Sequence, residues 1–148
     1  MRLKDILAAK GGNIIGIEPT ADLVAAAKLL STHRIGALLV RDADGRLVGI
    51  LSERDIVRTM ADVGSAVLQV PVAQVMTRNV STCDVNDSIS SVMERMTKGK
   101  FRHMPALDND RLVGLVSIGD VLKSHIDTQY ERVRNLEELI AELQMMRI

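Results

Sequence analysis

Aromatic residues are almost absent from this 148-residue chain, which contains no tryptophan, one phenylalanine (Phe101) and one tyrosine (Tyr130). Proteins that bind single-stranded nucleic acid stack bases on several aromatic side chains, and this chain has no such row. Net charge is also absent, because 19 Lys and Arg residues balance 19 Asp and Glu residues. Since no positive field attracts a phosphate backbone or an anionic membrane surface, we expect neither nucleic acid nor a membrane as a partner.

Cysteine and metal-ligand patterns are equally scarce. The single cysteine, Cys83, cannot form an internal disulfide, and His33 and His125 have no partners at metal-ligand spacing, so we expect no metal. The charged residues Lys4 and Lys10 interrupt the N-terminal segment, which therefore does not read as a signal peptide. No run approaches the ~20 apolar residues that span a bilayer. These absences predict a soluble, cytoplasmic protein.

Patterns typical of catalysis are missing as well. The sequence shows no nucleophile with a base and an orienting group, no metal cluster and no Walker-type phosphate loop. We therefore expect the protein not to be an enzyme.

The chain does contain an internal duplication. Residues 46–57 return as residues 111–122, each copy beginning Arg-Leu-Val-Gly and continuing to a serine and, three residues later, an aspartate. Such self-similarity is typical of a repeated structural unit. Neither copy buries much core by itself, so the two are expected to pack together.

The apolar pattern of each copy predicts the order strand, helix, strand, strand, helix. In the first copy we expect a strand at 13–17, a helix starting at Thr20 or Asp22, strands at 35–40 and 47–51, and a helix from about 53 to 62. In the second we expect a strand at 79–83, a helix starting within 86–88 and a last helix from about 118 to 127. Asp44-Gly45 between two apolar runs indicates a hairpin. The predicted fold class is α+β, with two β-α-β-β-α repeats packed sheet to sheet.

The expected organisation has five parts. They are an N-terminal segment (1–12), a first repeat (13–63), a linker containing Pro71 (64–76), a second repeat (77–128) and a C-terminal amphipathic helix (129–148). Apolar residues recur in the last part at helical spacing: Tyr130, Val133, Leu136, Ile140 and Leu143. This helix either folds back on its own repeat or contacts a second copy, and we favour a homodimer because isologous dimers are the commonest oligomers.

The duplicated element order, the Leu-Val-Gly strand and the Ser-x-x-Asp that follows it resemble CBS domains. These domains are named after cystathionine β-synthase and occur in kinase gamma subunits, inosine monophosphate dehydrogenases and ion transporters. The resemblance covers about residues 13–127, and residues 100–105 and 112–121 are similar to small bacterial proteins made of little but a CBS pair, or Bateman module. It implies a non-catalytic sensor that binds an adenosine nucleotide between its repeats. AMP is the expected ligand, with NAD, NADH, ADP, ATP or S-adenosylmethionine as other possibilities known in the family.

Ser52 and Asp55, with their counterparts Ser117 and Asp120, stand where a strand meets a helix. One interpretation is a helix cap that satisfies free amides of the first turn. The other is a nucleotide site, since a helix N-terminus suits a phosphate and a carboxylate can accept hydrogen bonds from ribose hydroxyls. The resemblance implies the second role, with one serine and one aspartate in each of two pockets.

The resemblance adds further candidates in the second copy. Arg102 and His103 are either a solvated basic pair or phosphate ligands, and Pro105 follows them. The first copy has Ile35 and Gly36 in the matching places, so we expect unequal pockets. Segments 13–15 and 77–80 are expected to hold adenine, which gives the candidates Ile14, Thr77, Asn79 and Val80. Met104, which follows the basic pair, is a further candidate for the adenine pocket.

The sequence therefore predicts a regulatory module that binds an adenosine nucleotide and acts in trans on an unknown protein. The alternative is a structural dimerisation module whose pockets are inactive.

Overall fold

The computed structural model describes residues 1–11 and 14–146 of the chain. Its elements are, in order, α1 (Leu3–Lys10), β1 (Gly16–Ile17), α2 (Leu23–His33), β2 (Ala37–Arg41), β3 (Leu47–Ser52), α3 (Glu53–Val63), η1 (Gly64–Gln69), α4 (Val72–Val75), β4 (Cys83–Asp84), α5 (Ile89–Gly99), β5 (His103–Asp108), β6 (Arg111–Ser117) and α6 (Ile118–Met145). The predicted duplication and the mixed α+β class are confirmed.

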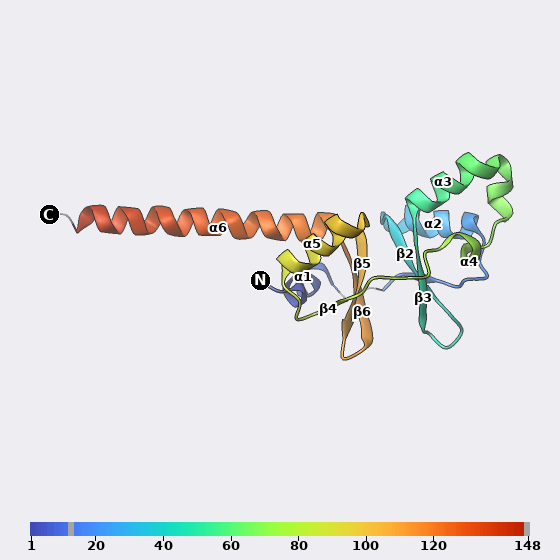
Figure 1. The fold of residues 1–148 in the computed structure, drawn as a ribbon, viewed down its shortest axis with the longest axis horizontal. Helices are drawn as coiled ribbons and strands as arrows, with labels where there is room; N and C mark the ends of the chain where they lie inside the picture. The colour runs from blue at the N-terminus through green and yellow to red at the C-terminus, as the bar shows by residue number, and fades with distance from the viewer. Residues whose placement is uncertain (12–13, 147–148) are drawn as a thin grey trace.

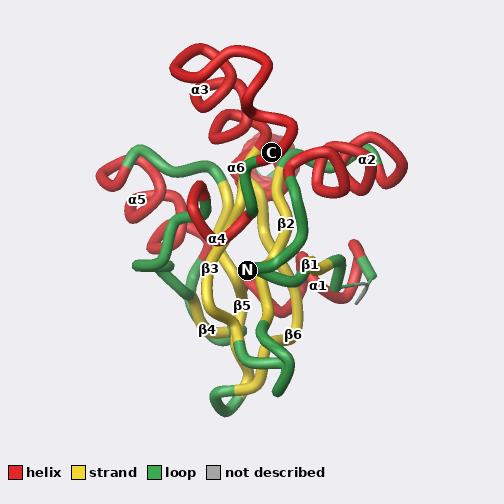
Figure 2. Tube along the Cα trace, turned by 90° about the vertical axis from the view of Figure 1, so that its right-hand side faces the viewer, coloured by secondary structure: helices red, strands yellow, loops and turns green. Residues whose placement is uncertain are grey.

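Each repeat contains one three-stranded sheet, with the strand order β1-β2-β3 in the first and β4-β5-β6 in the second. The first two strands of each sheet run parallel and the last two antiparallel. The hairpin predicted at Asp44-Gly45 joins β2 to β3. The two sheets face each other at the centre of the molecule, and the helices lie on their outer sides (Figures 1 and 2).

The first strand of each repeat is shorter than predicted. Only Gly16–Ile17 and Cys83–Asp84 pair with their sheets, whereas the expected strands began three or four residues earlier. Before β4, Thr77 instead forms an isolated antiparallel bridge with Ile50 of β3, in the other repeat. Asn13, an expected member of the first strand and of the adenine pocket, lies outside the described residues.

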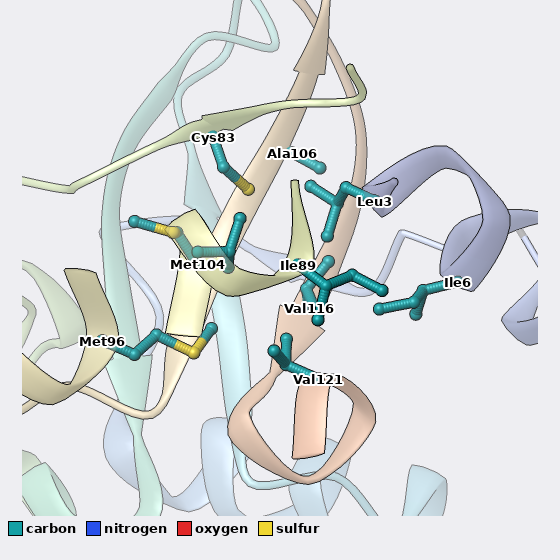
Figure 3. Packing of buried hydrophobic residues seen from close by; sticks show 10 residues of the cluster. Leu3, Ile6, Cys83, Ile89, Met96, Met104, Ala106, Val116 and Val121 are labelled. Atoms are coloured by element: carbon teal, nitrogen blue, oxygen red, sulfur yellow. The ribbon is translucent and has the colours of Figure 1, made fainter. Parts of the chain in front are cut away.

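The segments expected to be an N-terminal extension and a linker form helices that complete the opposite repeat. The Leu3 amide donates to the Asp87 carbonyl oxygen in the second repeat (3.0 Å), and the Val72 amide donates to the Ala21 carbonyl oxygen in the first (2.8 Å). Leu3 and Val72 are fully buried there. Figure 3 shows Leu3 and Ile6 of α1 within the core of the second repeat. Helices α1 and α4 are thus exchanged between the repeats.

This exchange explains the glycine of the repeated Leu-Val-Gly motif. A Cβ added at Gly49 would lie 2.6 Å from Met76 Sδ, and one at Gly114 would lie 2.8 Å from Leu7 Cδ2. Met76 directly follows α4 and Leu7 belongs to α1, so each glycine makes room for the exchanged segment. The motif is a packing requirement that the duplication preserves.

Each repeat has a hydrophobic core of its own, between its sheet and its helices. The first is formed by Ile17, Leu23, Ala26, Leu30, Leu38, Val40, Leu51, Val67, Val72 and Met76, and the second by Leu3, Ile6, Cys83, Ile89, Val92, Met96, Met104, Ala106, Val116 and Val121. Aliphatic and sulfur-containing side chains fill both cores, because the chain has almost no aromatic residues. The two sheets face each other as expected, but the residues of the two cores lie between each sheet and the helices that cover it, including the exchanged helices.

Helix α6 is one continuous 28-residue helix. The predicted boundary between the second repeat and a separate C-terminal helix, at 128/129, does not exist, because no glycine or proline interrupts the helical pattern there. The helix starts on the second repeat and extends far beyond it (Figure 1).

Candidate functional site

The two Ser-x-x-Asp motifs form the same reciprocal cap at the start of α3 and α6. Ser52 Oγ accepts the Asp55 amide at 3.3 Å, and Asp55 Oδ2 accepts the Ser52 amide at 2.9 Å. In the second repeat, Ser117 Oγ accepts the Asp120 amide at 3.1 Å and Asp120 Oδ2 accepts the Ser117 amide at 3.0 Å. The capping interpretation is confirmed for both motifs. Each cap occupies one carboxylate oxygen, so the other oxygen decides what more the aspartate can do.

The motif of the first repeat opens into a cavity of about 430 Å³ between the two repeats. The first repeat contributes Ser52 and Asp55. The second repeat contributes most of the opposite wall, including the predicted residues Thr77, Asn79, Val80, Arg102 and His103. With Ser117, which also borders this space, the fold thus brings together eight candidates that lie up to 65 positions apart in the sequence. We call this space the Asp55 cavity.

The motif of the second repeat faces a smaller cavity of about 330 Å³. Ser117 and Asp120 line it from the second repeat, while Ile15 and Arg34 line it from the first. His103 reaches both cavities. We call this space the Asp120 cavity.

The two aspartates differ in their cationic neighbours. Lys10, from the end of α1, donates from Nζ to Asp120 Oδ2 at 2.7 Å and to the Leu115 carbonyl oxygen at 3.0 Å. The one cationic group of the described residues within 4 Å of the Asp55 carboxylate is the Arg58 guanidinium, with Nη1 3.9 Å from Oδ1. Lys10 and the cap share Oδ2 of Asp120, so this carboxylate is already paired with a cation, whereas, among the described residues, Oδ2 of Asp55 accepts only the cap. Oδ1 accepts no hydrogen bond from a described residue in either aspartate.

The pKa values reflect this asymmetry. Burial acts to raise the pKa of Asp120, but hydrogen bonds from Lys10 and from the Ser117 amide and hydroxyl outweigh it and lower the pKa below its usual value. Burial lowers the pKa of His103, and the nearby Lys10 cation lowers it further, with Glu53 and Asp120 opposing. Near pH 7 the imidazole is therefore neutral and Asp120 is charged.

The strand pairing corrects the expected alignment of the basic residues. The residue that pairs with the capping serine is Ala37 in the first sheet and His103 in the second. Gly36 is therefore the counterpart of Arg102, and the expected match of Ile35 and Gly36 to the basic pair was displaced by one residue. The conclusion drawn from it holds, since the first repeat has no charged side chain at either place.

Arg34 and Lys100 occupy equivalent places in the two repeats. Arg34 ends α2 in a left-handed conformation, before β2 begins at Ala37, as Lys100 ends α5 before β5 (φ 53° and 55°). Arg34 lines the Asp120 cavity and Lys100 lines the Asp55 cavity, so each cavity has a cation at this place.

Three predicted residues are not brought to either cavity. Met104 is fully buried in the core of the second repeat, because strand alternation turns it away from the face that carries His103. Pro105 is also fully buried. Ile14 is half-buried and lines neither cavity, whereas its neighbour Ile15 lines the Asp120 cavity.

Several lining residues were not predicted. Lys10 comes from a segment outside the repeats, and no local pattern in the sequence points to it. Phe101 lines the Asp55 cavity. Its position directly before the basic pair Arg102 and His103 is the signal in the sequence that could have indicated it. Arg54 and Arg58, on the first turns of α3, also border the Asp55 cavity.

The one cysteine lies outside the two cavities, and the described residues contain neither a metal-ligand cluster nor a membrane-spanning helix. Cys83 is buried in the second core, and burial raises the pKa of its thiol to about 12. Within residues 1–11 and 14–146, no group of three His, Cys, Asp or Glu side chains is arranged to hold a metal ion. No helix in the same residues is long and apolar enough to cross a membrane.

Comparison with known proteins agrees with this architecture. A family model described as CBS domain matches residues 3–62 and again residues 72–127, and each match starts at the first residue of an exchanged helix. A CBS domain-containing protein of Bacillus subtilis is 31% identical over 114 residues, which cover 76% of this chain and 79% of that protein. Among the curated relatives, the chain spans 66% of a 17.7 kDa protein of Acidianus ambivalens, and between 17% and 71% of five CBS domain-containing proteins of Arabidopsis thaliana.

Two solved structures are similar over most of the chain. A CBS-domain containing protein from Agrobacterium tumefaciens is 44% identical, with a TM-score of 0.82 over 84% of this chain and 92% of that one. The CBS domain pair of protein MJ0100, in complex with 5′-methylthioadenosine and S-adenosyl-L-methionine, is 29% identical, with a TM-score of 0.76 over 86% of this chain and 98% of that one. Because the family matches cover both repeats and both exchanged helices, the chain belongs to the CBS-domain family, as a tandem pair of CBS repeats.

Proposed function

We propose that this protein is a non-catalytic regulatory module that binds an adenosine nucleotide in the Asp55 cavity. The observation that carries the proposal is the uncommitted Oδ1 of Asp55 beside a helix N-terminus, in a cavity walled by both repeats. The complex of the MJ0100 CBS pair with two adenosine compounds supports it, since that pair is similar over 86% of this chain.

Each part of a nucleotide has a suitable partner in this cavity. Asp55 Oδ1 can accept hydrogen bonds from the ribose hydroxyls. In the first turn of α3 the Glu53 and Asp55 amides donate to the Gly36 carbonyl oxygen and to Ser52 Oγ, which leaves the Arg54 amide and the Ser52 hydroxyl for a phosphate. Arg102 adds a guanidinium. Val80 and Ile50 provide an apolar surface for adenine. The volume of about 430 Å³ falls within the range of ~300–1,000 Å³ that small-molecule sites occupy.

AMP is the nucleotide we propose first, because the lining includes several cations that an uncharged adenosine compound would not use. Arg54, Arg58, Lys100 and Arg102 border the cavity, against the two acids Glu53 and Asp55. ADP, ATP, NAD, NADH and S-adenosylmethionine are the other candidates. Binding between the repeats would favour one relative packing of the two sheets, and a protein that contacts this module would respond to that change.

The Asp120 cavity is proposed as the weaker site. Lys10 pairs with the capping oxygen Oδ2 of Asp120 and offsets the charge of the carboxylate, so Oδ1 of Asp120 is a weaker acceptor for ribose hydroxyls than Oδ1 of Asp55. A second bound nucleotide is therefore expected only at higher concentration.

Thermal unfolding in the presence of each candidate ligand tests the proposal. A ligand at 100 times its dissociation constant adds ~2.7 kcal/mol to the free energy of unfolding, which raises Tm by roughly 5–10 °C at this chain length. We expect a rise with AMP or another adenosine nucleotide and none with GMP. If no compound of the panel moves Tm, the alternative applies, and the protein is a structural dimerisation module with inactive cavities.

We further propose that the protein is a cytoplasmic homodimer that regulates another protein in trans. The single cysteine, which leaves no disulfide framework, supports the location, and the exposed apolar face of α6 supports the homodimer.

A further inference from the structure

Helix α6 carries an unpartnered apolar stripe along most of its length. Six residues of the stripe are about half exposed: Leu122 (43%), Ile126 (51%), Val133 (53%), Leu136 (58%), Ile140 (53%) and Leu143 (54%). The helix runs along the long axis of the molecule and leaves the second repeat behind (Figure 1). Its own repeat therefore cannot cover this stripe.

The stripe follows a heptad repeat. With Ile126 at position a, the a positions are Ile126, Val133 and Ile140, and the d positions are Leu122, Gln129, Leu136 and Leu143. In parallel coiled coils, β-branched residues at position a with leucine at position d favour two helices over three or four. Residues Val121 and Ser124, at positions c and f, are buried against the second repeat, so the seam points away from it.

Charge and polarity on the stripe agree with the same geometry. In a parallel pair, position g of one helix lies next to position e of the partner's following heptad. Arg132 occupies g and would meet the partner's Glu137 at e, and the two-fold axis repeats this opposite-charge contact. Gln129, the one polar residue among the a and d positions, meets the partner's Gln129 only when the helices are parallel and in register.

We propose that a second copy of this chain covers the stripe and that the two α6 helices form a parallel two-stranded coiled coil over Leu122–Leu143. This inference specifies the surface and orientation of the homodimer proposed above, and it does not depend on nucleotide binding. The two-fold axis of such a coil runs along the helices. Both CBS pairs therefore lie at the same end of the coil, with the second repeats next to each other.

Sedimentation of the full chain tests the surface. The wild-type protein should sediment at twice the 16.2 kDa chain mass. Leu136→Asp places a charge in the seam and should raise the dimer dissociation constant by on the order of 100-fold, giving a monomer. Asn135→Asp adds the same charge at position c and should leave the dimer intact. Both residues lie beyond the cores, so thermal unfolding should show that the repeats remain folded.

Cross-linking tests the orientation. A disulfide requires Cα atoms about 4.4–6.8 Å apart, a distance that equivalent d positions of a parallel pair satisfy. Leu143→Cys should therefore form an oxidant-dependent covalent dimer, while Glu142→Cys on the outer face should not. Cys83 is buried with a raised pKa and does not interfere.

Three results would overturn the inference. A dimer that survives Leu136→Asp would move the proposed homodimer to another surface. A dimer lost in Leu136→Asp without cross-linking of Leu143→Cys would exclude the parallel orientation. A monomeric wild-type chain would remove the coiled coil and the homodimer together, and would leave the nucleotide proposal unaffected.

Discussion

The two cavities between the repeats are built from equivalent parts, yet they present different surfaces to a ligand. Both have a capping serine and aspartate at a helix start and a cation at the end of the neighbouring helix. They differ in what comes from outside the repeat, since Lys10 of α1 binds Asp120 and no equivalent side chain binds Asp55. The duplication thus sets the geometry of the two sites, and one exchanged helix sets their chemistry.

The largest expected difference is in AMP affinity, between variants of the two aspartates. Asp55→Asn should weaken AMP binding about 100-fold, because a charge-assisted hydrogen bond contributes ~1.5–3 kcal/mol and the amide can still cap α3. Asp120→Asn should change the same affinity by less than about threefold. Calorimetric titration measures both. Equal losses in the two variants would mean that the cavities are equivalent and that Lys10 does not distinguish them.

Removing the cation should make the cavities more alike. Lys10→Met keeps the apolar stem and frees Asp120, so a second equivalent of AMP should bind at least about tenfold more tightly than in the wild type. The pair is partly exposed, and its loss should cost the folded protein no more than about 1 kcal/mol. Lys4→Met, an exposed change on the same helix, is the control. If the affinity for the second equivalent of AMP does not change, Lys10 is not the cause of weak binding in the Asp120 cavity.

Arg102 should separate charged from uncharged ligands. Arg102→Ala should weaken AMP binding roughly tenfold, which corresponds to one charge-assisted hydrogen bond, while adenosine binding should stay within about twofold. Arg111→Ala, on the exposed hairpin of the same sheet, should affect neither ligand. A parallel loss of AMP and adenosine would place Arg102 at the sugar or the base, or in a purely structural role.

His103 gives the smallest expected effect, and its sign depends on pH. The pKa of His103 is lowered in the folded protein, so the unfolded chain binds the proton more readily, and stability is lost as pH falls through about 6.5. His103→Gln should flatten this part of the stability curve by a few tenths of a kcal/mol up to about 1 kcal/mol. Urea unfolding between pH 5 and 8 measures it. Saturating AMP should reduce the slope in the wild type, because a nearby phosphate raises the pKa of the imidazole. A wild-type slope identical to that of the variant would contradict the burial of His103.

Local patterns predicted the parts of this molecule that depend on local physics. The Asp44-Gly45 hairpin, the Ser-Asp caps and the duplicated element order follow from turn chemistry, free helix amides and apolar periodicity. Thr77 and Arg102 reached the predicted cavity because the repeat positions them together. What could not be predicted depends on long-range packing. Nothing near Lys10 in the sequence indicates that α1 lies on the second repeat.

Strand direction explains the other differences. Met104 was proposed for the cavity from its place in a resembling motif, but alternation along β5 commits it to the core beside Ala106. The unbroken α6 was divided because the repeat seemed to end at residue 128. The helical pattern itself shows no such boundary.

The exchange of α1 and α4 has a consequence for how this protein can be divided. A fragment that ends before Val72 would leave the first repeat without the helix that seals it, and one that starts after Lys10 would leave the second open. Each half therefore depends on a helix that the other half of the chain contributes to its core. Although the gene carries a visible duplication, neither half is a self-sufficient unit, and shuffling between such proteins must move both together.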